Sequence, residues 1–274
     1  MKKIGFIGAG NMAQAIIKGI INANVYLPKD ILISDIATNR LDKLKELYGV
    51  TPAESNIAIT QSVDVLILSV KPQGMSAVLK EIQGHVADST LVISIAAGIT
   101  TDYICRMLPN AHVVRSMPNT PAMVDEGAAA LYSANALPEH MDLAMKLFSA
   151  IGKAVIVDKE ELIDAVTAVS GSGPAYFFLL MEEMVRVAEA MQIPPDIAEE
   201  LVYQTAKGAG VMAMQAYARN ESPANLRRKV TSPMGTTEAA MNVFEKLDFA
   251  KVVDSALQAA RARSQELSTC FIEE

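Results

Sequence analysis

The chain has 274 residues, with 24 Lys and Arg against 31 Asp and Glu, so its formal net charge is −7. At roughly 100–200 residues per domain, this length predicts one large domain or two ordinary ones. The acidic balance argues against nucleic acids and anionic membranes as partners, because domains that bind nucleic acids carry a basic surface. A hydrophobic content of 51% predicts a globular protein.

Features of secreted, membrane and metal-binding chains are weak in this sequence. Gly5, Gly8 and Gly10 interrupt the apolar start, so we expect no cleaved leader, and no run approaches the roughly 18 uninterrupted apolar residues of a membrane span. Cys105 and Cys270 lie far apart without metal-ligand spacing. They predict buried or half-buried thiols rather than a disulfide or a zinc site, and the chain is expected to be cytoplasmic, with no bound metal.

The first half of the chain alternates short apolar runs with segments of helical periodicity. This repeated βα pattern predicts a doubly wound parallel sheet of the Rossmann type within an α/β fold, with the last two runs extending the same sheet. The predicted strands are residues 4–7, 31–34, 65–70, 91–96, 113–115, 128–132 and 154–157. The predicted helices are residues 12–22, 40–48, 74–82, 101–108 and 139–151.

The second half of the sequence lacks the βα alternation of the first half. A charged junction at residues 158–161 precedes a helix-rich sequence in which prolines start or stop the helices. We therefore predict a dinucleotide-binding domain over residues 1–158 and an all-helical domain over residues 159–274. Residues 176–181 (YFFLLM) are apolar through more than a full turn, so they must be enclosed. A second copy of the chain is expected to cover them, and burial between helices of the same chain is the alternative.

A glycine-rich turn follows the first predicted strand. Its sequence GAGNMA opens a helix in the G-x-G-x-x-A pattern of dinucleotide-binding proteins. Gly8 permits the tight turn, Gly10 lets the backbone approach a pyrophosphate, and Ala13 allows close packing of helix on strand. The amides at the helix start, at Asn11 and Met12, would then bind the phosphates. A turn with only a structural role is the alternative.

The end of the second strand bears on the choice of dinucleotide. Asp35 follows Ser34 at the place where an acidic residue accepts hydrogen bonds from the ribose hydroxyls of NAD. Arg40 follows closely, and its guanidinium could pair with the additional phosphate of NADP. The sequence leaves NADH and NADPH both open. A capping Asp35 and a solvated Arg40 are the alternative to a binding role.

Further strand ends converge on the same crevice, because ligands of open α/β sheets bind at the carboxyl ends of the strands. Val70, Lys71 and Pro72 come at the end of one predicted strand, and Ala97 follows the next. We expect all four to line the dinucleotide crevice, with a surface role as the alternative for Lys71. The stiff loop at residues 117–121 is expected to wall its nicotinamide side.

Two segments of the second half are rich in glycine and hydroxyl residues: 170–176 (SGSGPAY) and 230–237 (VTSPMGTT). Together with the glycine-rich turn and residues 117–121 (MPNTP), they make the sequence resemble pyrroline-5-carboxylate reductase over essentially the whole chain. The resemblance implies a Rossmann domain followed by an all-helical dimerisation domain, active sites between subunits and often a decamer of five dimers. It also implies hydride transfer from NADPH, or NADH in some members, to the cyclic imine of 1-pyrroline-5-carboxylate, the last step of proline synthesis.

The resemblance also assigns individual residues. It places Asn56 near the adenosine end of the cofactor. Other cofactor positions of the family match Ser34, Val70, Lys71 and Ala97. The resemblance places Thr167 near the imine nitrogen as the catalytic residue, where its hydroxyl could donate a hydrogen bond to that nitrogen or relay a proton toward it through water. The positions that hold the substrate carboxylate are Ser232, Gly235, Thr236 and Thr237. Family members usually have glycine where this chain has Met234.

The chemistry of these residues agrees with that assignment. A Ser/Thr loop at a helix start offers hydroxyl and amide donors to a carboxylate, and a helix cap that needs only Ser232 is the alternative. A protonated imine already carries the charge that makes its carbon electrophilic, so no strong general acid is required. The alternative to a role at the imine nitrogen is that the Thr167 hydroxyl forms a hydrogen bond with the backbone of its own helix. Asp164 is expected to be a solvated carboxylate on a helix face.

Three histidines, His85, His112 and His140, stand in no motif that converges on the cofactor, and we expect surface or structural roles for them. Two other functions compete with an imine reductase. A 3-hydroxyacid or 6-phosphogluconate-type dehydrogenase also joins a Rossmann domain to a helical one, but requires a lysine as acid and base. A non-enzymatic dinucleotide-sensing protein could keep the fold without the chemistry.

Overall fold

The computed structural model describes residues 3–270. The chain packs as two compact units. Unit 1 comprises the residues up to Pro174 and returns from Gln258 onward, and unit 2 comprises Ala175–Leu257. Two helices, α8 (Gly173–Ala190) and α12 (Phe249–Cys270), each contribute residues to both units.

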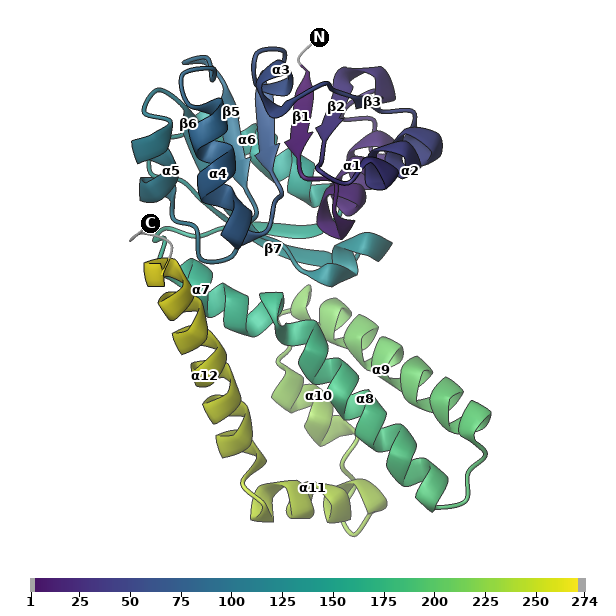
Figure 1. Cartoon of the computed structure of the whole chain (residues 1–274). Helices are drawn as coiled ribbons and strands as arrows, with labels where there is room; N and C mark the ends of the chain where they lie inside the picture. Colours follow the sequence, from purple (N-terminus) through teal and green to yellow (C-terminus); the bar gives the residue numbers. More distant parts are fainter. Residues whose placement is uncertain (1–2, 271–274) are drawn as a thin grey trace. The chain divides into compact units, whose positions relative to one another are not determined.

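Unit 1 is built on a sheet that has eight strands within the described residues, in the order β3-β2-β1-β4-β5-β6-β7-β8 (Figure 1). The first six in this order follow the Rossmann arrangement and pair in parallel. β7 pairs antiparallel to β6 and parallel to β8, so the last two strands run against the other six. The strands are β1 Ile4–Ile7, β2 Ile31–Ser34, β3 Thr51–Pro52, β4 Val65–Leu68, β5 Leu91–Ser94, β6 His112–Met117, β7 Gly127–Tyr132 and β8 Gly152–Ile156.

Helices cover both faces of this sheet, which is why β1, β4 and β5 are buried at every position. One apolar core joins α1 and α6 to the sheet, through residues such as Ile16, Ile20 and Phe148. The other joins α3, α4 and α5, through residues such as Ile59 and Leu79. The helices that lie wholly in unit 1 are α1 Asn11–Asn22, α2 Thr38–Tyr48, α3 Asn56–Thr60, α4 Pro72–Ile82, α5 Thr101–Met107, α6 Pro138–Ser149 and α7 Leu162–Val166.

The predicted doubly wound α/β architecture is confirmed, and every predicted strand and helix of the first half is present within a few residues of its expected bounds. β3 escaped prediction because it has only two residues, one of them Pro52. The compact units do not divide where residues 158–161 suggested, because α7 packs on β6 and β7 and the end of α12 hydrogen-bonds to Asp164 through Ser264. The division into 1–158 and 159–274 stays a prediction about sequence domains.

Unit 2 is helical, as expected, with α9 (Pro195–Tyr217), α10 (Pro223–Lys229) and α11 (Thr236–Lys246) beside its parts of α8 and α12. Pro195 and Pro223 each occupy the first position of a helix, where the missing amide costs no hydrogen bond. The Ser222 hydroxyl accepts a hydrogen bond from the Asn225 amide and caps α10. Prolines therefore start helices here as the sequence predicts.

The apolar run in α8 is not buried within the chain. Phe177 is 64% exposed, Phe178 60% and Leu179 59%. Burial between helices of the same chain, the alternative considered above, is therefore wrong. The helical segment Leu162–Ala190 is long and apolar enough to cross a membrane by length and composition alone, although no span was expected from the sequence. An exposed apolar helix requires a cover that a single copy of this chain does not supply.

Candidate dinucleotide and substrate sites

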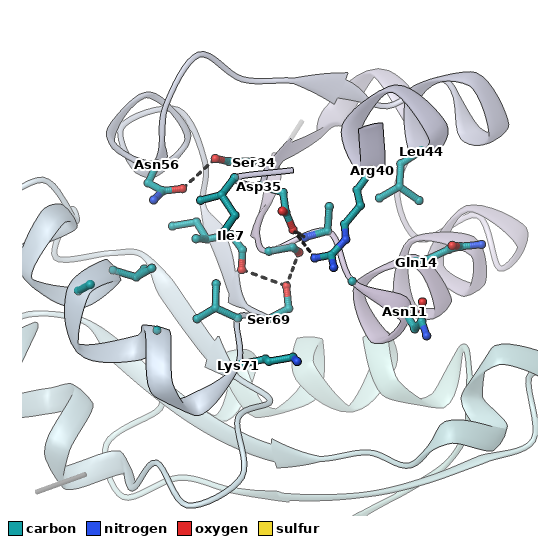
Figure 2. Close-up of a pocket in the computed structure, with 18 of the residues that line it drawn as sticks. Ile7, Asn11, Gln14, Ser34, Asp35, Arg40, Leu44, Asn56, Ser69 and Lys71 are labelled. Atoms are coloured by element: carbon teal, nitrogen blue, oxygen red, sulfur yellow. Dashed lines mark hydrogen bonds and ion pairs between the residues drawn. The ribbon is translucent and has the colours of Figure 1, made fainter. Parts of the chain in front are cut away.

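A cleft of about 730 Å³ opens at the carboxyl ends of β1, β2 and β4 (Figure 2). This is where a Rossmann sheet binds its ligand. The glycine turn, the end of β2, α3 and the start of α4 all contribute to it. Its lining includes these residues predicted to bind the cofactor: Gly8, Gly10, Asn11, Ser34, Asp35, Arg40, Asn56, Val70 and Lys71.

The glycine turn has the geometry that its sequence predicts. Gly8 adopts φ +99°, and its amide donates a hydrogen bond to the Ser34 carbonyl at 2.8 Å. A Cβ at Gly8 would lie 2.7 Å from the Ser69 carbonyl, so no larger residue fits there. A Cβ at Gly10 would meet nothing within 4 Å, and α1 begins without a side-chain cap. The turn therefore presents open backbone and a helix N-terminus to the cleft, which suits a phosphate.

Asp35 is held by backbone amides. Its side chain is 6% exposed, and its two carboxylate oxygens accept hydrogen bonds from the amides of Ala9 at 2.7 Å and Ala37 at 2.8 Å. Arg40 approaches the same carboxylate at 3.4 Å, and its own side chain is 55% exposed. The capping role considered for Asp35 is therefore wrong, because α1 and α2 both begin without a side-chain cap. Asp35 instead holds the turns after β1 and β2, and the Arg40 cation beside it lines the cleft.

A polar chain crosses the adenosine end of the predicted site. The Ser34 hydroxyl donates to the Asn56 side-chain oxygen at 2.8 Å, and the Asn56 amide nitrogen donates to Glu81 at 2.7 Å. These bonds join β2, α3 and α4 at one wall of the cleft, and Figure 2 shows the one between Ser34 and Asn56. The arrangement fixes the orientation of the Asn56 amide before any ligand arrives.

Several residues that line the cleft lie on helix faces and were not predicted from the sequence, because the prediction considered only the ends of strands. Gln14 on α1, Lys43 and Leu44 on α2 and a stripe on α4 also line the cleft. The α4 stripe is Gly74, Ala77, Val78 and Glu81, whose three- and four-residue spacing could have identified it.

Three residues predicted to bind the cofactor are not among those that line the cleft. Met12 packs half-buried against the core under α1, and Pro72 occupies the first turn of α4. Ala97 lies in the turn after β5. These three stay predictions, and the geometry of the cleft in a single chain gives them no support.

The predicted substrate loop lies in unit 2, between α10 and α11. Gly235 is the N-cap of α11 without a side-chain cap, and its amide donates to the Ser232 carbonyl at 3.0 Å. The alternative in which Ser232 serves as the helix cap is therefore wrong. Thr236 and Thr237 occupy the first two helical positions. This tight turn leaves a helix start flanked by hydroxyl groups, which is suited to a carboxylate.

The backbone at Met234 suits the glycine that the resemblance implies at this position. It adopts φ +59° and is 96% exposed, and its amide donates to the Glu238 carboxylate at 2.8 Å. This left-handed conformation is costly for a residue with a Cβ but not for glycine.

We expect Met234→Gly to raise the free energy of unfolding by about 0.5–1 kcal/mol, because it removes left-handed strain without removing a buried contact. Urea unfolding at one fixed protein concentration measures the change. Met191→Gly is the control: Met191 is also exposed and lies in the turn after α8, but its φ is not positive, so glycine there removes no strain and should be destabilising. Equal destabilisation by both substitutions would contradict the strain at Met234.

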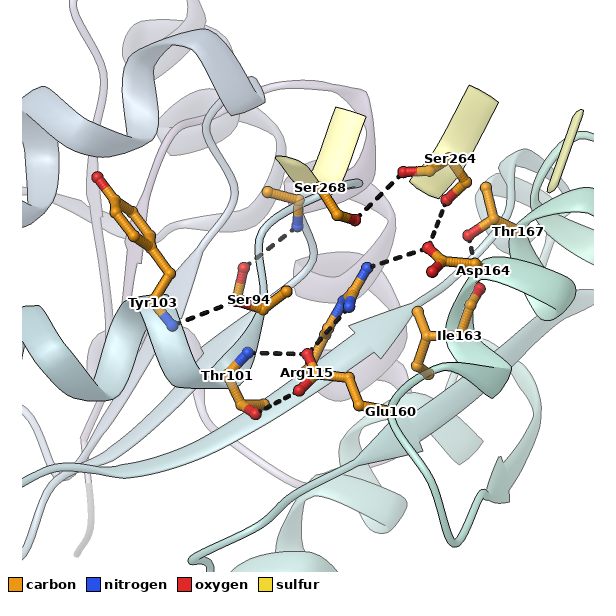
Figure 3. A network of polar contacts seen from close by, with 12 residues as sticks. Ser94, Thr101, Tyr103, Arg115, Glu160, Ile163, Asp164, Thr167, Ser264 and Ser268 are labelled. Atoms are coloured by element: carbon orange, nitrogen blue, oxygen red, sulfur yellow. Dashed lines mark hydrogen bonds and ion pairs between the residues drawn. The ribbon is translucent and has the colours of Figure 1, made fainter. Parts of the chain in front are cut away.

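Thr167 begins a π-helical turn, Thr167–Gly171, in which the Ser172 amide donates to the Thr167 carbonyl at 2.8 Å. The Thr167 hydroxyl donates to the Ile163 carbonyl at 2.7 Å, so it does bond its own helix backbone. In this arrangement its oxygen presents lone pairs rather than a proton. The expectation of a solvated Asp164 is wrong: this carboxylate is buried and accepts a hydrogen bond from Ser264 at 2.7 Å (Figure 3).

The three histidines and Cys105 lie outside the cleft lining. His112 contacts the Asn135 carbonyl at 3.1 Å and stacks near His140 with ring centroids 4.4 Å apart, while His85 is exposed. Cys105 is half-buried as predicted, and burial, assisted by the nearby carboxylates of Asp102 and Glu160, raises the pKa of its thiol. The side chain of Cys270 lies outside the described residues. Among the described residues, no group of three or more His, Cys, Asp or Glu is placed to hold a metal ion.

Comparisons with known proteins cover nearly all of the chain. The family model described as pyrroline-5-carboxylate reductase dimerisation matches residues 160–267, and one described as NADP oxidoreductase coenzyme F420-dependent matches residues 3–98. The pyrroline-5-carboxylate reductase of Pseudomonas aeruginosa is 43% identical over 268 residues, covering 97% of each chain. That of Haemophilus influenzae is 40% identical, covering 98% of this chain and 99% of the relative.

Solved structures agree with this. A pyrroline-5-carboxylate reductase from Coxiella burnetii superimposes with a TM-score of 0.90 at 38% identity, covering 97% of this chain and 98% of the other. The Plasmodium falciparum pyrroline carboxylate reductase with NADP bound has a TM-score of 0.86 at 28% identity, with the same two coverages.

Proposed function

The chain belongs to the pyrroline-5-carboxylate reductase family, and we propose that it reduces the C=N bond of 1-pyrroline-5-carboxylate with NADPH to give L-proline. It is an NAD(P)H-dependent oxidoreductase. The observation that carries the proposal is the Gly8–Gly10 turn open to a 730 Å³ cleft, in a chain that aligns over 97% of its length with reductases of this name. The expected activity is loss of nicotinamide absorbance only when the imine and the reduced cofactor are both present.

The donor set of the cleft fits a dinucleotide. The open backbone at Gly8 and Gly10 and the first amides of α1, at Asn11 and Met12, would hold the pyrophosphate. Ser34, Asn56 and Arg40 would hold the adenosine ribose and its phosphate. Val70, Lys71, Pro72 and Ala97 would follow the crevice toward the nicotinamide, which supplies the hydride when bound.

Arg40 supports a preference for NADPH. Asp35 would repel a ribose phosphate if its charge were open to the cleft, but two amides and Arg40 hold that carboxylate. The half-exposed guanidinium can then pair with the phosphate of NADP bidentately.

We expect Arg40→Ala to raise the KM for NADPH by about tenfold to a hundredfold and to leave the KM for NADH within about twofold, because a charge-assisted pair contributes about 1.5–3 kcal/mol. Steady-state assays with each cofactor measure this split. The matched control is Arg106→Ala, which removes another 55%-exposed arginine in an ion pair, outside the cleft lining. An equal rise in KM for both cofactors would show that Arg40 does not bind the additional phosphate of NADP.

The substrate is a small cyclic amino acid analogue whose carboxylate is its best handle. We place this carboxylate at the start of α11, where Ser232 and the Gly235–Thr237 segment offer hydroxyl and amide donors. The imine arrives protonated, so it needs orientation rather than a general acid. Thr167 suits this, because its hydroxyl proton is engaged by Ile163 and its oxygen can accept a hydrogen bond from the iminium N–H.

We expect Thr237→Val to raise the KM for 1-pyrroline-5-carboxylate by about tenfold or more, since a lost hydrogen bond to a charged group contributes about 1.5–3 kcal/mol. The dissociation constant for NADPH should not change. Thr231→Val is the matched control, because the Thr231 hydroxyl is already bonded to the Arg227 carbonyl at the end of α10. An unaltered KM in Thr237→Val would remove this residue from the substrate site.

Two competing functions make different predictions. A 3-hydroxyacid or 6-phosphogluconate-type dehydrogenase would reduce NADP with a hydroxyacid and leave the imine untouched. A dinucleotide-sensing protein would bind NADPH without any turnover. We expect neither behaviour, because the second polar loop at Ser232–Thr237 has no use in a protein that only binds the cofactor.

The proposal extends to the oligomeric state and the cellular location of the enzyme. The dimerisation family and the exposed apolar helix support a homo-oligomer, and we propose a homodimer assembled further into a ring of five dimers, with active sites between subunits. We place the enzyme in the cytoplasm, without a membrane or nucleic acid as partner. The dimer, rather than a bilayer, then covers the exposed apolar side chains of α8 within the segment Leu162–Ala190.

A further inference from the structure

A buried arginine lies at the centre of a polar cluster in unit 1 (Figure 3). Arg115 on β6 is 2% exposed. One guanidinium nitrogen donates to Glu160 at 2.9 Å, and another lies 3.8 Å from Asp164. Glu160 also accepts the amide and the hydroxyl of Thr101, at 2.8 and 2.6 Å, and Asp164 accepts the Ser264 hydroxyl at 2.7 Å. The cluster therefore ties β6, the start of α5, α7 and the end of α12 together.

Stability alone does not account for this cluster. Apolar side chains of similar volume often stabilise a core as well as a buried ion pair does, because desolvation of the charges offsets their attraction. A charged cluster differs from apolar packing because its hydrogen bonds and ion pairs fix the orientation of the groups that make them. Glu160, two residues before α7, and Asp164, within α7, both face one cation, so Arg115 constrains where α7 lies on the sheet.

The turn that follows α7 is the part of the chain this would control. Ile163, next to Asp164, accepts the Thr167 hydroxyl at 2.7 Å. Thr167 then begins the π-helical turn, a rare form of helix that is frequent at functional sites. At its far end, the Asn119 side chain donates to the Ser170 carbonyl at 3.0 Å and accepts the Ala128 amide at 2.8 Å. The sheet thus holds the turn from both ends, through Asp164 and through Asn119.

We propose that Asp164 and Arg115 are positioning residues, which hold the π-helical turn so that the Thr167 oxygen is placed for the protonated imine. This rests on the proposed function. Neither side chain lines the dinucleotide cleft. Their effect should therefore fall on turnover of the imine and not on binding of NADPH.

The experiment is a double-mutant cycle in the full-length oligomer. Asp164→Asn keeps the size and the acceptor for Ser264 but removes the charge that faces Arg115; Asp164→Ala removes both. We expect kcat for 1-pyrroline-5-carboxylate to fall by about threefold to tenfold in the first and about tenfold to a hundredfold in the second, since small misplacements of reacting groups are costly. The dissociation constant for NADPH, measured by fluorescence titration, should stay within about twofold of the wild type. Asp102→Asn, which breaks the exposed ion pair with Arg106, is the matched control and should keep wild-type kcat.

The cycle is completed with Thr167→Val and the double variant Asp164→Asn/Thr167→Val. If Asp164 acts through Thr167, the double variant loses no more kcat than Thr167→Val alone. Multiplicative losses, or a wild-type kcat in either single variant, would overturn the proposal. Should Asp164→Ala not fold, Asp164→Asn decides by the same criteria. A wild-type enzyme that binds NADPH but does not turn over the imine would instead contradict the proposed function itself.

Discussion

Replacement of Gly8 by alanine is expected to abolish binding of NADPH and to lower the free energy of unfolding by about 2–4 kcal/mol. The residue has φ +99°, and a Cβ would lie 2.7 Å from the backbone of Ser69 and 2.9 Å from that of Val70. Neither neighbour can move aside, because Ser69 is bonded to β1: its amide donates to Ile7 at 2.9 Å and its hydroxyl to Gly8 at 2.7 Å. The turn would have to open, and the phosphate-binding amides would lose their alignment.

Fluorescence titration with NADPH and urea unfolding measure the two effects. Gly10→Ala is the informative control, since its Cβ would meet nothing within 4 Å but would project beside the expected pyrophosphate. We expect this variant to fold with nearly wild-type stability and to bind NADPH more weakly. If Gly8→Ala bound NADPH with wild-type affinity, the turn would not be the phosphate site.

Replacement of Phe178 by aspartate is expected to break the oligomer and to remove most of the imine reductase activity. Phe177, Phe178 and Leu179 are each about 60% exposed in one chain, and burial of such side chains contributes about 1.5–3 kcal/mol apiece. Two symmetry-related copies of an unpaired buried carboxylate would offset that gain in every dimer. Because we place the active site between subunits, the imine reductase activity should be lost when the oligomer dissociates.

Size-exclusion chromatography with light scattering measures the assembly. The wild-type protein should have a mass of ten 29.4 kDa chains, and Phe178→Asp should shift toward a single chain. Leu27→Asp, at a 44%-exposed leucine of unit 1, is the matched control and should leave the mass unchanged. A wild-type mass of one chain at micromolar concentration would contradict the assembly.

Local patterns predicted most of unit 1. Apolar runs at β1, β4 and β5 identify strands buried on both faces, and the spacing of Gly8 and Gly10 has a direct geometric cause. The same periodicity is blind to direction, because an apolar strand looks alike whether it runs parallel or antiparallel. The reversed direction of β7 and β8 could therefore not be predicted from the sequence.

Long-range partners limited prediction of the site. Asp164 was expected to be solvated because its bonding partner, Ser264, is 100 residues away in the sequence. Asp35 offered the residue type of a ribose ligand, but its backbone partners Ala9 and Ala37 become visible only in the folded turn. The positive φ of Met234 depends on the turn into α11, which composition does not reveal.

The most direct measurement follows the transferred hydrogen. The enzyme is incubated with 1-pyrroline-5-carboxylate and NADPH that carries deuterium at either transferable position of the nicotinamide, and the product is examined by mass spectrometry. The account predicts L-proline with one deuterium on the former imine carbon from one of the two labelled cofactors. Proline without deuterium from both cofactors, or consumption of neither reactant, would contradict it.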